Sequence, residues 1–334
     1  MVKKYGLRGR EESAMGSKKP GVTRARLLLA FAAIYVLWGS TYLAIRLAID
    51  TLPPFLMAGS RFLVAGAALY AYSSRSGRPA LSARHWWNAA VASVLLFVLG
   101  NGGVTWAEQT IPSGAAALIN ATVPAWLLLL DWRYGGRSRP RAMELVGIGL
   151  GMAGVAVLSA PGGVDPVGAG VLMLASVAWA TGSLFSRYAR FPSSPLLTAG
   201  MQMLVGGAFL IGLGLAAGEG RRLDPAAASW QSFTAWTYLV VVALVALPAY
   251  TWLLTAASPT MVGTHAFVNP LVAVVFGWAF IGEELAGRTG AAAALVVLGV
   301  ILLVLSRRRP ALPTTVVITE TEEARSIRPT ARVR

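Results

Sequence analysis

The sequence contains no cysteine and only two histidines, and charged residues make up only 13% of its 334 positions. The absence of cysteine excludes disulfide bonds and thiol chemistry. His85 and His265 are too few to ligate a typical catalytic metal, and no Gly-rich phosphate loop ending in Lys-Ser or Lys-Thr is present. We therefore expect no metal and no cofactor. Since soluble domains contain about 25% charged residues, an ordinary soluble fold is also excluded.

Apolar residues make up 56% of the chain. It falls into ten long runs, each close to the ~20 residues that cross a bilayer as a helix. The runs are continuous rather than alternating, which favours helices over a β-barrel. The sequence thus predicts an all-α integral membrane protein with ten transmembrane helices, at 27–49, 54–73, 86–108, 112–132, 142–160, 167–188, 195–217, 233–257, 260–281 and 288–306.

The net charge of +15 suggests nucleic acid until the 29 basic residues are sorted by position. With the N-terminus in the cytoplasm, 24 of them fall in cytoplasmic segments and three in external loops. This bias follows the positive-inside rule and places both termini in the cytoplasm. Basic pairs such as Lys18-Lys19 are suited to anionic lipid headgroups. Membrane lipids are therefore expected partners, and nucleic acid is not.

The chain divides into two polar tails and two membrane halves. The tails cover 1–24 and 307–334, and the halves cover 25–160 and 161–306. The first apolar run is longer than the 7–15 residues of a signal-peptide core, so we expect it to be a retained helix. In the fifth run, the glycines from Gly147 to Gly154 indicate close helix packing, which could include a homodimer interface.

The two halves are related by an internal repeat. A shift of 141 residues pairs Trp38 with Trp179 and Arg46 with Arg187, and it continues through the next run with nine identities in sixteen positions. Shifts of 146 and 145 align the later runs, including Trp106 with Trp252 and Pro124 with Pro270. Because each half has five helices, the second must enter the membrane from the opposite side. Such inverted repeats permit alternating access around a site near the midplane, although a purely structural duplication is the alternative.

Several short motifs carry a resemblance to a known family. They are Leu37-Trp38-Gly39-Ser40-Thr41, Leu52-Pro53-Pro54, Ile111-Pro112-Ser113-Gly114-Ala115, Val268-Asn269-Pro270-Leu271 and Gly282-Glu283-Glu284-Leu285. In this order the chain resembles the EamA family of the drug/metabolite transporter superfamily. The stretch from Ala107 to Pro124 resembles its YedA-like exporters. The resemblance implies a central cavity between the halves and export of amino acids, related metabolites or drugs. One departure is Asp131 to Gly136, where the repeat usually has a Gly-Glu pair.

Ionisable side chains within the spans are the first candidates for a substrate site, because they are costly in lipid. Arg61 lies about eight residues into its span, opposite neutral Gln202 in the repeat. It either faces the cavity and attracts a carboxylate, or bonds to helix-end carbonyls. His265 is a candidate for proton coupling, or a packed hydrogen-bonding residue. Glu108 is interpreted as a solvated cap, and Arg46 and Arg187 as snorkelling to headgroups.

Aromatic and polar residues complete the candidate set. Paired tryptophans in apolar runs either line a cavity or pack in the bundle. Pro124 and Pro270 predict helix kinks, and Asn120 and Asn269 beside them either bind substrate at a broken helix or repair it locally. The candidates of this kind are Trp38, Ser40, Tyr42, Trp106, Asn120, Trp179, Thr181, Ser183, Tyr250, Trp252 and Asn269.

The sequence as a whole predicts a secondary transporter in a bacterial inner membrane, exporting a small molecule without a cofactor. One alternative is an integral-membrane enzyme, which would need clustered acidic or histidine side chains. The other is a membrane receptor or structural subunit without flux.

Overall fold

The computed structural model describes residues 23–75, 81–134, 139–160, 163–224, 226–256, 265–284 and 287–306. Every regular element in these ranges is helical. The first half contains α1 (Arg24–Gly39), α2 (Thr41–Ala48), α3 (Pro54–Arg75), α4 (Ala83–Ser93), the π-helix η1 (Val94–Gly102), α5 (Gly103–Ala107), α6 (Ser113–Asn120), α7 (Val123–Tyr134) and α8 (Ala142–Ser159). The second contains α9 (Pro166–Tyr188), α10 (Pro195–Ala216), the 3₁₀ turn η2 (Glu219–Arg221), α11 (Trp230–Ala256), α13 (His265–Ile281) and α14 (Gly287–Ser306).

Most of these helices are long and apolar enough to cross a membrane. Among the described residues, seven satisfy both conditions, and they coincide with the first seven predicted spans. Three shorter apolar helices, at 230–246, 268–281 and 287–303, lie where the remaining spans are predicted. Large apolar side chains cover the outside, as in Leu174 and Phe280, which are both 70% exposed. A soluble monomer rarely exposes so much apolar surface, so the all-helical membrane fold is confirmed.

Three of the predicted spans are interrupted. The first breaks at Ser40 between α1 and α2, and the fourth breaks at Ala121 and Thr122 between α6 and α7. Pro124 is the second residue of α7, where its missing N–H costs nothing, so the predicted kink is a complete break. By contrast, α13 continues through Pro270. The third span changes from α4 to η1 and back to α5, and such π segments are often found at functional sites.

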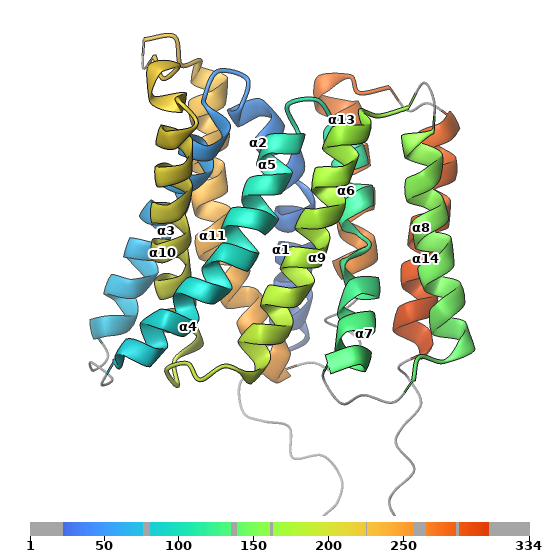
Figure 1. Ribbon diagram of the computed structural model, residues 1–334, viewed down its shortest axis with the longest axis horizontal. Helices are drawn as coiled ribbons and strands as arrows, with labels where there is room; N and C mark the ends of the chain where they lie inside the picture. The colour runs from blue at the N-terminus through green and yellow to red at the C-terminus, as the bar shows by residue number, and fades with distance from the viewer. Residues whose placement is uncertain are drawn as a thin grey trace, which may run out of the picture.

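Corresponding helices of the two halves pack against each other in antiparallel pairs (Figure 1). In the first pair, glycines bring α3 and α10 into contact. A Cβ on Gly59 would lie 2.9 Å from the Gly207 carbonyl oxygen, and one on Gly66 would lie 3.1 Å from that of Gly200. Shifting the numbers by 141 turns the first contact into the second. The contact is therefore symmetric about a point between the two helices.

The second pair, α8 and α14, repeats this arrangement. A Cβ on Gly147 would lie 2.7 Å from the Gly299 oxygen, and one on Gly154 would lie 2.9 Å from the Ala292 oxygen. A shift of 145 again exchanges the two contacts. The prediction that these glycines favour close packing is thus correct for Gly147 and Gly154, but the partner is α14 of the same chain rather than a second copy. Gly149 meets nothing within 4 Å.

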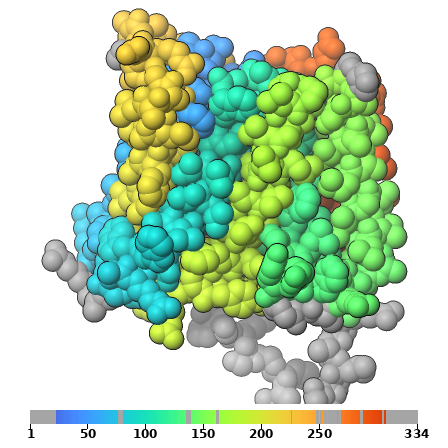
Figure 2. All heavy atoms as spheres, viewed as in Figure 1, coloured from blue at the N-terminus to red at the C-terminus, as the bar shows by residue number. Residues whose placement is uncertain are grey.

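The ends of the helices define two faces of the molecule. The start of α1 and the end of α14 lie at the lower edge of Figure 1, which we call the terminal face. The opposite edge, the far face, carries the starts of α3, α6 and α9. Side chains of α10, α4 to α5, α9 and α8 cover the front of the bundle (Figure 2). The largest buried apolar cluster lies behind them, around Leu118, Ile119 and Leu172.

Candidate functional site

The break at Ser40 places a hydroxyl group inside the bundle. Ser40 is 5% exposed, and its Oγ lies 2.6 Å from the Tyr238 hydroxyl of α11. The Ser40 hydroxyl also lies 3.0 Å from the Leu37 carbonyl oxygen. A helix that ends and restarts within an apolar bundle leaves backbone groups needing partners. The interruption therefore creates a polar point at the junction of α1, α2 and α11.

Asn120, at the end of α6, links two other elements at a similar interruption. Its side-chain nitrogen donates to the Tyr42 hydroxyl of α2 at 2.7 Å. Its side-chain oxygen lies 3.0 Å from the Ser176 Oγ of α9, from which it accepts. The structure thus joins two predicted candidates, Tyr42 and Asn120, with one that the sequence did not single out. The amide binds side chains of other helices rather than repairing its own helix end.

Trp38 and His265 form a third contact between the halves. Their rings meet edge to face, with centroids 5.3 Å apart, in an arrangement that aromatic rings favour. Asn269 lies one turn beyond His265 on α13, and its side-chain oxygen is buried without a hydrogen-bond partner among the described residues. The Asn269 backbone oxygen lies close to Gly39. These three candidates therefore lie together near the Ser40 break.

Arg61 is buried in α3, with 4% of its surface exposed. Its Nη2 donates to Oδ1 of Asn101, in η1, at 3.4 Å. Its Nε has no hydrogen-bond partner among the described residues. A guanidinium has five N–H donors, so Arg61 has most of its donor capacity unused. These contacts do not support the alternative in which Arg61 hydrogen-bonds to helix-end carbonyl oxygens.

Glu108, immediately after α5, is not the solvated cap that the sequence suggested. It is 0% exposed, and neither carboxylate oxygen has a hydrogen-bond partner among the described residues. The prediction failed because span length measures distance along the helix and not the packing around its end. Arg46 is exposed, as the snorkelling interpretation requires, and its Nη1 also donates to the Glu108 backbone oxygen at 2.7 Å.

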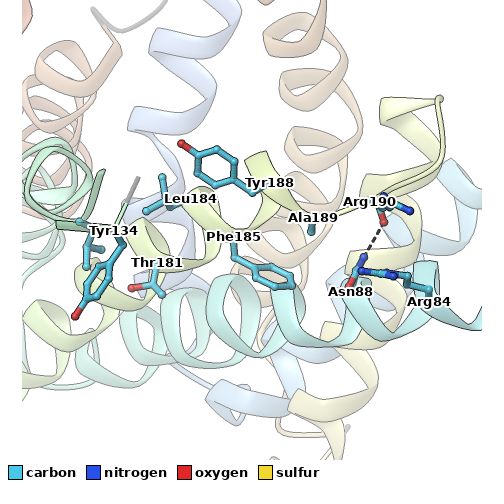
Figure 3. Close-up of a pocket in the computed structure, with 10 residues that line it drawn as sticks. Arg84, Asn88, Tyr134, Thr181, Leu184, Phe185, Tyr188, Ala189 and Arg190 are labelled. Atoms are coloured by element: carbon cyan, nitrogen blue, oxygen red, sulfur yellow. Dashed lines mark hydrogen bonds between the residues drawn. The ribbon is translucent and has the colours of Figure 1, made fainter. Parts of the chain in front are cut away.

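A cavity of about 500 Å³ lies between α4, α7 and α9 near the terminal face (Figure 3). Thr181, Phe185 and Tyr188 of α9 border it, so one predicted candidate, Thr181, lines this cavity. Arg84 of α4 and Arg190 beyond α9 supply positive charge. Asn88 donates to the Arg190 carbonyl oxygen at 2.8 Å. The cavity combines aromatic walls with cationic groups, which suits an anion with an apolar body.

The remaining candidates are not brought into these groups. Trp179 is 37% exposed and packs against Gly100 of η1. Ser183 donates to the Trp179 carbonyl oxygen of its own helix at 2.7 Å. Gln202 is buried on α10, where its backbone oxygen accepts from Ser93 at 2.7 Å. Trp106 and Trp252 are partly buried against apolar clusters. The Tyr250 side chain lies outside the described residues.

At the far face, carboxylates from the second half bind the first turns of first-half helices. Glu219 accepts from the Leu56 N–H of α3 at 2.9 Å and from that of Phe55 at 3.2 Å. Glu283 accepts from the N–H groups of Ser113 and Gly114 at the start of α6, at 2.6 and 3.1 Å. Helix N-termini carry unsatisfied donors and partial positive charge. We call these contacts the far-face caps.

Each far-face cap follows a glycine with a positive backbone angle. Gly218 has φ 76° and Gly282 has φ 68°, and they are the only described residues with positive φ. An L side chain rarely adopts this conformation, so glycine is the residue suited to the turn. The Gly-Glu pair noted in the sequence thus has a role: Gly282 allows the sharp turn after α13, and Glu283 then reaches back to α6.

Asp165 caps the start of α9 on the same face. Its carboxylate accepts from the Gly168 N–H at 2.8 Å, the Thr110 hydroxyl at 3.1 Å and the Val167 N–H at 3.3 Å. The bond from Gly168 is the main cause that holds the pKa of Asp165 below its ordinary value. Burial, the next largest effect, opposes it, and the bonds from Thr110 and Val167 add smaller lowering contributions. Thr110 ties this cap to the loop after α5.

Comparison with known proteins identifies the arrangement. The sequence model of the EamA-like transporter family matches residues 25–160 and 166–305, most of both halves. The chain belongs to the EamA-like transporter family. The EamA fold is also found in a solved crystal structure with a TM-score of 0.59 and 21% identity, over 85% of this chain and 99% of that one.

Two bacterial relatives of this EamA chain are named as transporters. The uncharacterized inner membrane transporter YedA of Escherichia coli K12 is 36% identical over 282 residues, which is 83% of this chain and 90% of YedA. The uncharacterized transporter YvbV of Bacillus subtilis is 25% identical over 296 residues, or 84% and 92% of the two chains. By family, this protein is a membrane transporter and not an enzyme.

Sequence reasoning missed several polar residues of this EamA chain. Tyr238, Ser176 and Asn101 each contact a predicted candidate, yet none has a matched residue in the other half. A signal was present for Asn101, because an amide in the middle of an apolar run is costly without a partner. Ser176 gave no signal, since serine commonly bonds to its own helix.

Proposed function

We propose that the chain is a secondary exporter of small metabolites, such as amino acids or related compounds, or of drugs, working by alternating access in a bacterial inner membrane. Its two five-helix halves are inverted copies, and both termini lie in the cytoplasm. The printed name of YedA, an inner membrane transporter, supports this location. The presence of 24 of 29 basic residues in the segments predicted to be cytoplasmic supports the orientation.

The observation that carries the proposal is the symmetry of the paired helices. The contacts between Gly59 and Gly207 and between Gly66 and Gly200 exchange when the repeat is applied. An inverted pair of this kind has two equivalent arrangements, one for each assignment of conformations to the halves. Exchanging them opens one face and closes the other. A merely structural duplication gives no reason for polar breaks inside the bundle.

Cavities lie near both faces, of about 500 Å³ at the terminal face and about 570 Å³ beside Glu283 at the far face, so the proposed inward-facing state rests on the far-face caps. At the far face, the caps from Glu219 and Glu283 tie the second half to the first half. At the terminal face, the cavity around Thr181 lies between α4, α7 and α9, and Asn88 and Tyr188 still bridge these elements by hydrogen bonds to Arg190 and Asp131. With the terminal face in the cytoplasm, substrate reaches the bundle from the cell interior. Export follows when the caps release and the cavity closes.

Arg61 is the residue on which the choice of substrate class rests. A buried guanidinium with unused donors binds a carboxylate strongly, because charge-assisted hydrogen bonds are about twice as strong as neutral ones. Tyr42, Asn120 and Ser40 supply further hydroxyl and amide groups inside the bundle. These hydroxyl and amide groups can hydrogen-bond the polar parts of a small metabolite as it moves inward from the cavity.

Counterflow in proteoliposomes tests the function. Vesicles containing the purified chain are loaded with an unlabelled metabolite, and uptake of trace labelled metabolite is measured for a panel of amino acids, organic acids and amines. Saturable accumulation that requires the internal metabolite is expected for at least one carboxylate-containing compound. Absence of exchange for every member of the panel, with folded protein in the vesicles, would favour a receptor or structural subunit instead.

A further inference from the structure

Glu108 is a buried carboxyl group that the proposed transport path leaves without a role. It follows α5 at the far face, is 0% exposed, and has no hydrogen-bond partner at either oxygen within the described part of the chain. Its own backbone oxygen, in contrast, accepts from Arg46 at 2.7 Å. The main chain at Glu108 is therefore held by a hydrogen bond, while its carboxyl group has no hydrogen-bond partner among the described residues.

Four charged or titratable groups surround Glu108, and they come from three parts of the chain. Arg46 and Tyr42 belong to α2, Arg61 to α3, and Glu283 follows α13. No ion pair joins Glu108 to either arginine within 4 Å in the described structure, since Arg46 donates to carbonyl oxygens and Arg61 to Asn101. Glu283 carries the same charge as Glu108 and is held by two N–H groups of α6.

The cost of burying a carboxyl group without hydrogen bonds depends on its protonation state. Burying an ionised carboxylate without hydrogen bonds costs several kcal/mol or more, whereas the neutral acid is far less costly to bury. The two arginines offset part of this cost at a distance, but they supply no donor to either oxygen. The carboxyl group is therefore compatible with the closed far face as the neutral acid. Once the far face opens, water can solvate the anion.

We propose that Glu108 is a proton-binding site that links closure of the far face to external pH. The far face closes over Glu108 when an oxygen carries a proton. When the face opens, that O–H bond breaks and the proton passes to external water, leaving the hydrated carboxylate. The inference rests on the proposed alternation of the two faces. The only ligand of this site is a proton. Its binding at Glu108 shifts the equilibrium between the states with the far face closed and open.

Cysteine labelling tests this link without requiring any known substrate. The natural chain has no cysteine, so Thr105→Cys gives a single reactive position. Thr105 is 0% exposed and lies one turn before Glu108 on α5, so it reacts only when the far face opens. Cells expressing the variant are treated with a membrane-impermeant maleimide between external pH 5 and 9. A thiol reacts as its thiolate, and the thiolate fraction itself rises with pH below a pKa of about 8.5. The labelling rate is therefore divided by that of Ala226→Cys, an exposed position in the loop before α11. This ratio, which is the labelling referred to in this test, is expected to rise with pH, by up to about tenfold per unit for one linked proton.

Three variants in the Thr105→Cys background make the result decisive. Glu108→Gln is neutral at every pH, and it is expected to abolish the pH dependence while keeping the melting temperature in detergent. Glu284→Gln removes an exposed carboxylate beside Glu283 and is expected to keep the dependence. The proposal is overturned if labelling is independent of pH with Glu108 present, or if Glu108→Gln keeps the dependence. Loss of the dependence in His265→Ala, with Glu108 intact, would also overturn it in favour of the histidine.

The two proposals fail in distinguishable ways. Loss of pH-dependent labelling together with normal counterflow would refute the role of Glu108 and leave the transporter standing. Normal pH-dependent labelling without flux of any metabolite would refute the proposed export and leave a proton-linked conformational change.

Discussion

Arg61 and Gln202 occupy corresponding positions of the two halves, and only Arg61 is charged. The paired helices α3 and α10 are otherwise matched through their glycines, so this is a place where one half differs chemically from the other. A charge with unused donors is costly to keep in a bundle unless a ligand sometimes satisfies it. Asymmetry at this position is therefore expected to bear on substrate choice rather than on folding.

Arg61→Gln, which copies the residue of the other half, is predicted to weaken transport of carboxylate substrates. Loss of a charged hydrogen bond worth roughly 1.5–3 kcal/mol corresponds to about 10- to 150-fold in apparent affinity. Counterflow KM measures the effect, and neutral amino compounds without a carboxylate serve as the control substrates. Thermal stability should be retained, because the substitution removes a buried charge. An unchanged KM for carboxylates would place Arg61 in a structural role.

Asp165→Asn is predicted to remove a pH-dependent part of the stability. Since the pKa of Asp165 is lowered in the folded protein, its contribution is present above the unfolded value of about 3.9 and is lost as pH falls through the folded value. The natural chain should melt at a higher temperature than Asp165→Asn at pH 7. The two melting curves should converge below about pH 3.9. A difference that persists unchanged at lower pH would show that the cap acts without its charge.

At the residue scale, the structure brings some of the predicted polar candidates together, and it contradicts the sequence where packing decides. Asn120 was chosen for its place beside Pro124, and Tyr42 was chosen as a hydrogen-bonding group near Trp38, and the structure joins the two. Glu108 was assigned to solvent by its distance from the predicted span end, which contains no information about the helices that cover it. Whether any of these residues binds substrate stays a prediction.

At the scale of elements, the positions of the spans could be read from hydropathy, but their interruptions could not. Hydropathy averages over about 20 residues, whereas the break at Ser40 and the π segment from Val94 to Gly102 are set by single turns. Pro124 was the exception, because its missing N–H is a local signal. The glycine pattern of α8 correctly predicted close packing, but the sequence did not identify the partner helix.

Gly147→Ala is predicted to destabilise the pair of α8 and α14, because its Cβ would lie 2.7 Å from the Gly299 backbone oxygen. Overpacking of this kind typically costs about 1–3 kcal/mol. Gly149→Ala is the matched control two residues away, since its Cβ would meet nothing within 4 Å. It should be neutral or slightly stabilising, because alanine favours helix over glycine. Thermal unfolding in detergent measures both, and equal melting temperatures would contradict the packing.

At the scale of the whole molecule, the repeat was readable because it depends on identities spaced over 141 residues, and these are independent of local conformation. The far-face caps were not readable. Glu219 and Glu283 lie in loops of the second half, and their partners are backbone N–H groups of the first half, which leave no mark on the sequence. Only the glycine before each glutamate was visible, and its meaning depends on the fold.

The far-face caps and the terminal-face cavity should be linked, if the two faces alternate. Glu219→Gln combined with Glu283→Gln weakens the hydrogen bonds that hold the far face closed, because a neutral amide accepts less strongly than a carboxylate. The population of the inward-facing state should then fall. Thr181→Cys, in the cavity at the opposite end of the bundle, reports this as slower labelling in inside-out vesicles.

The size of the effect follows from the strength of the caps. If the free-energy difference between the inward-facing and outward-facing states changes by about 1.4 kcal/mol, the ratio of the two states changes tenfold. Once the inward-facing state is the minority, the labelling rate is expected to fall by the same factor. Glu284→Gln, which removes a neighbouring exposed carboxylate, should leave labelling unchanged. Faster labelling of Thr181→Cys in the double variant would mean that the caps merely hold the bundle together. A loosened bundle exposes both faces at once. Alternation, in contrast, exposes one face only when the other closes.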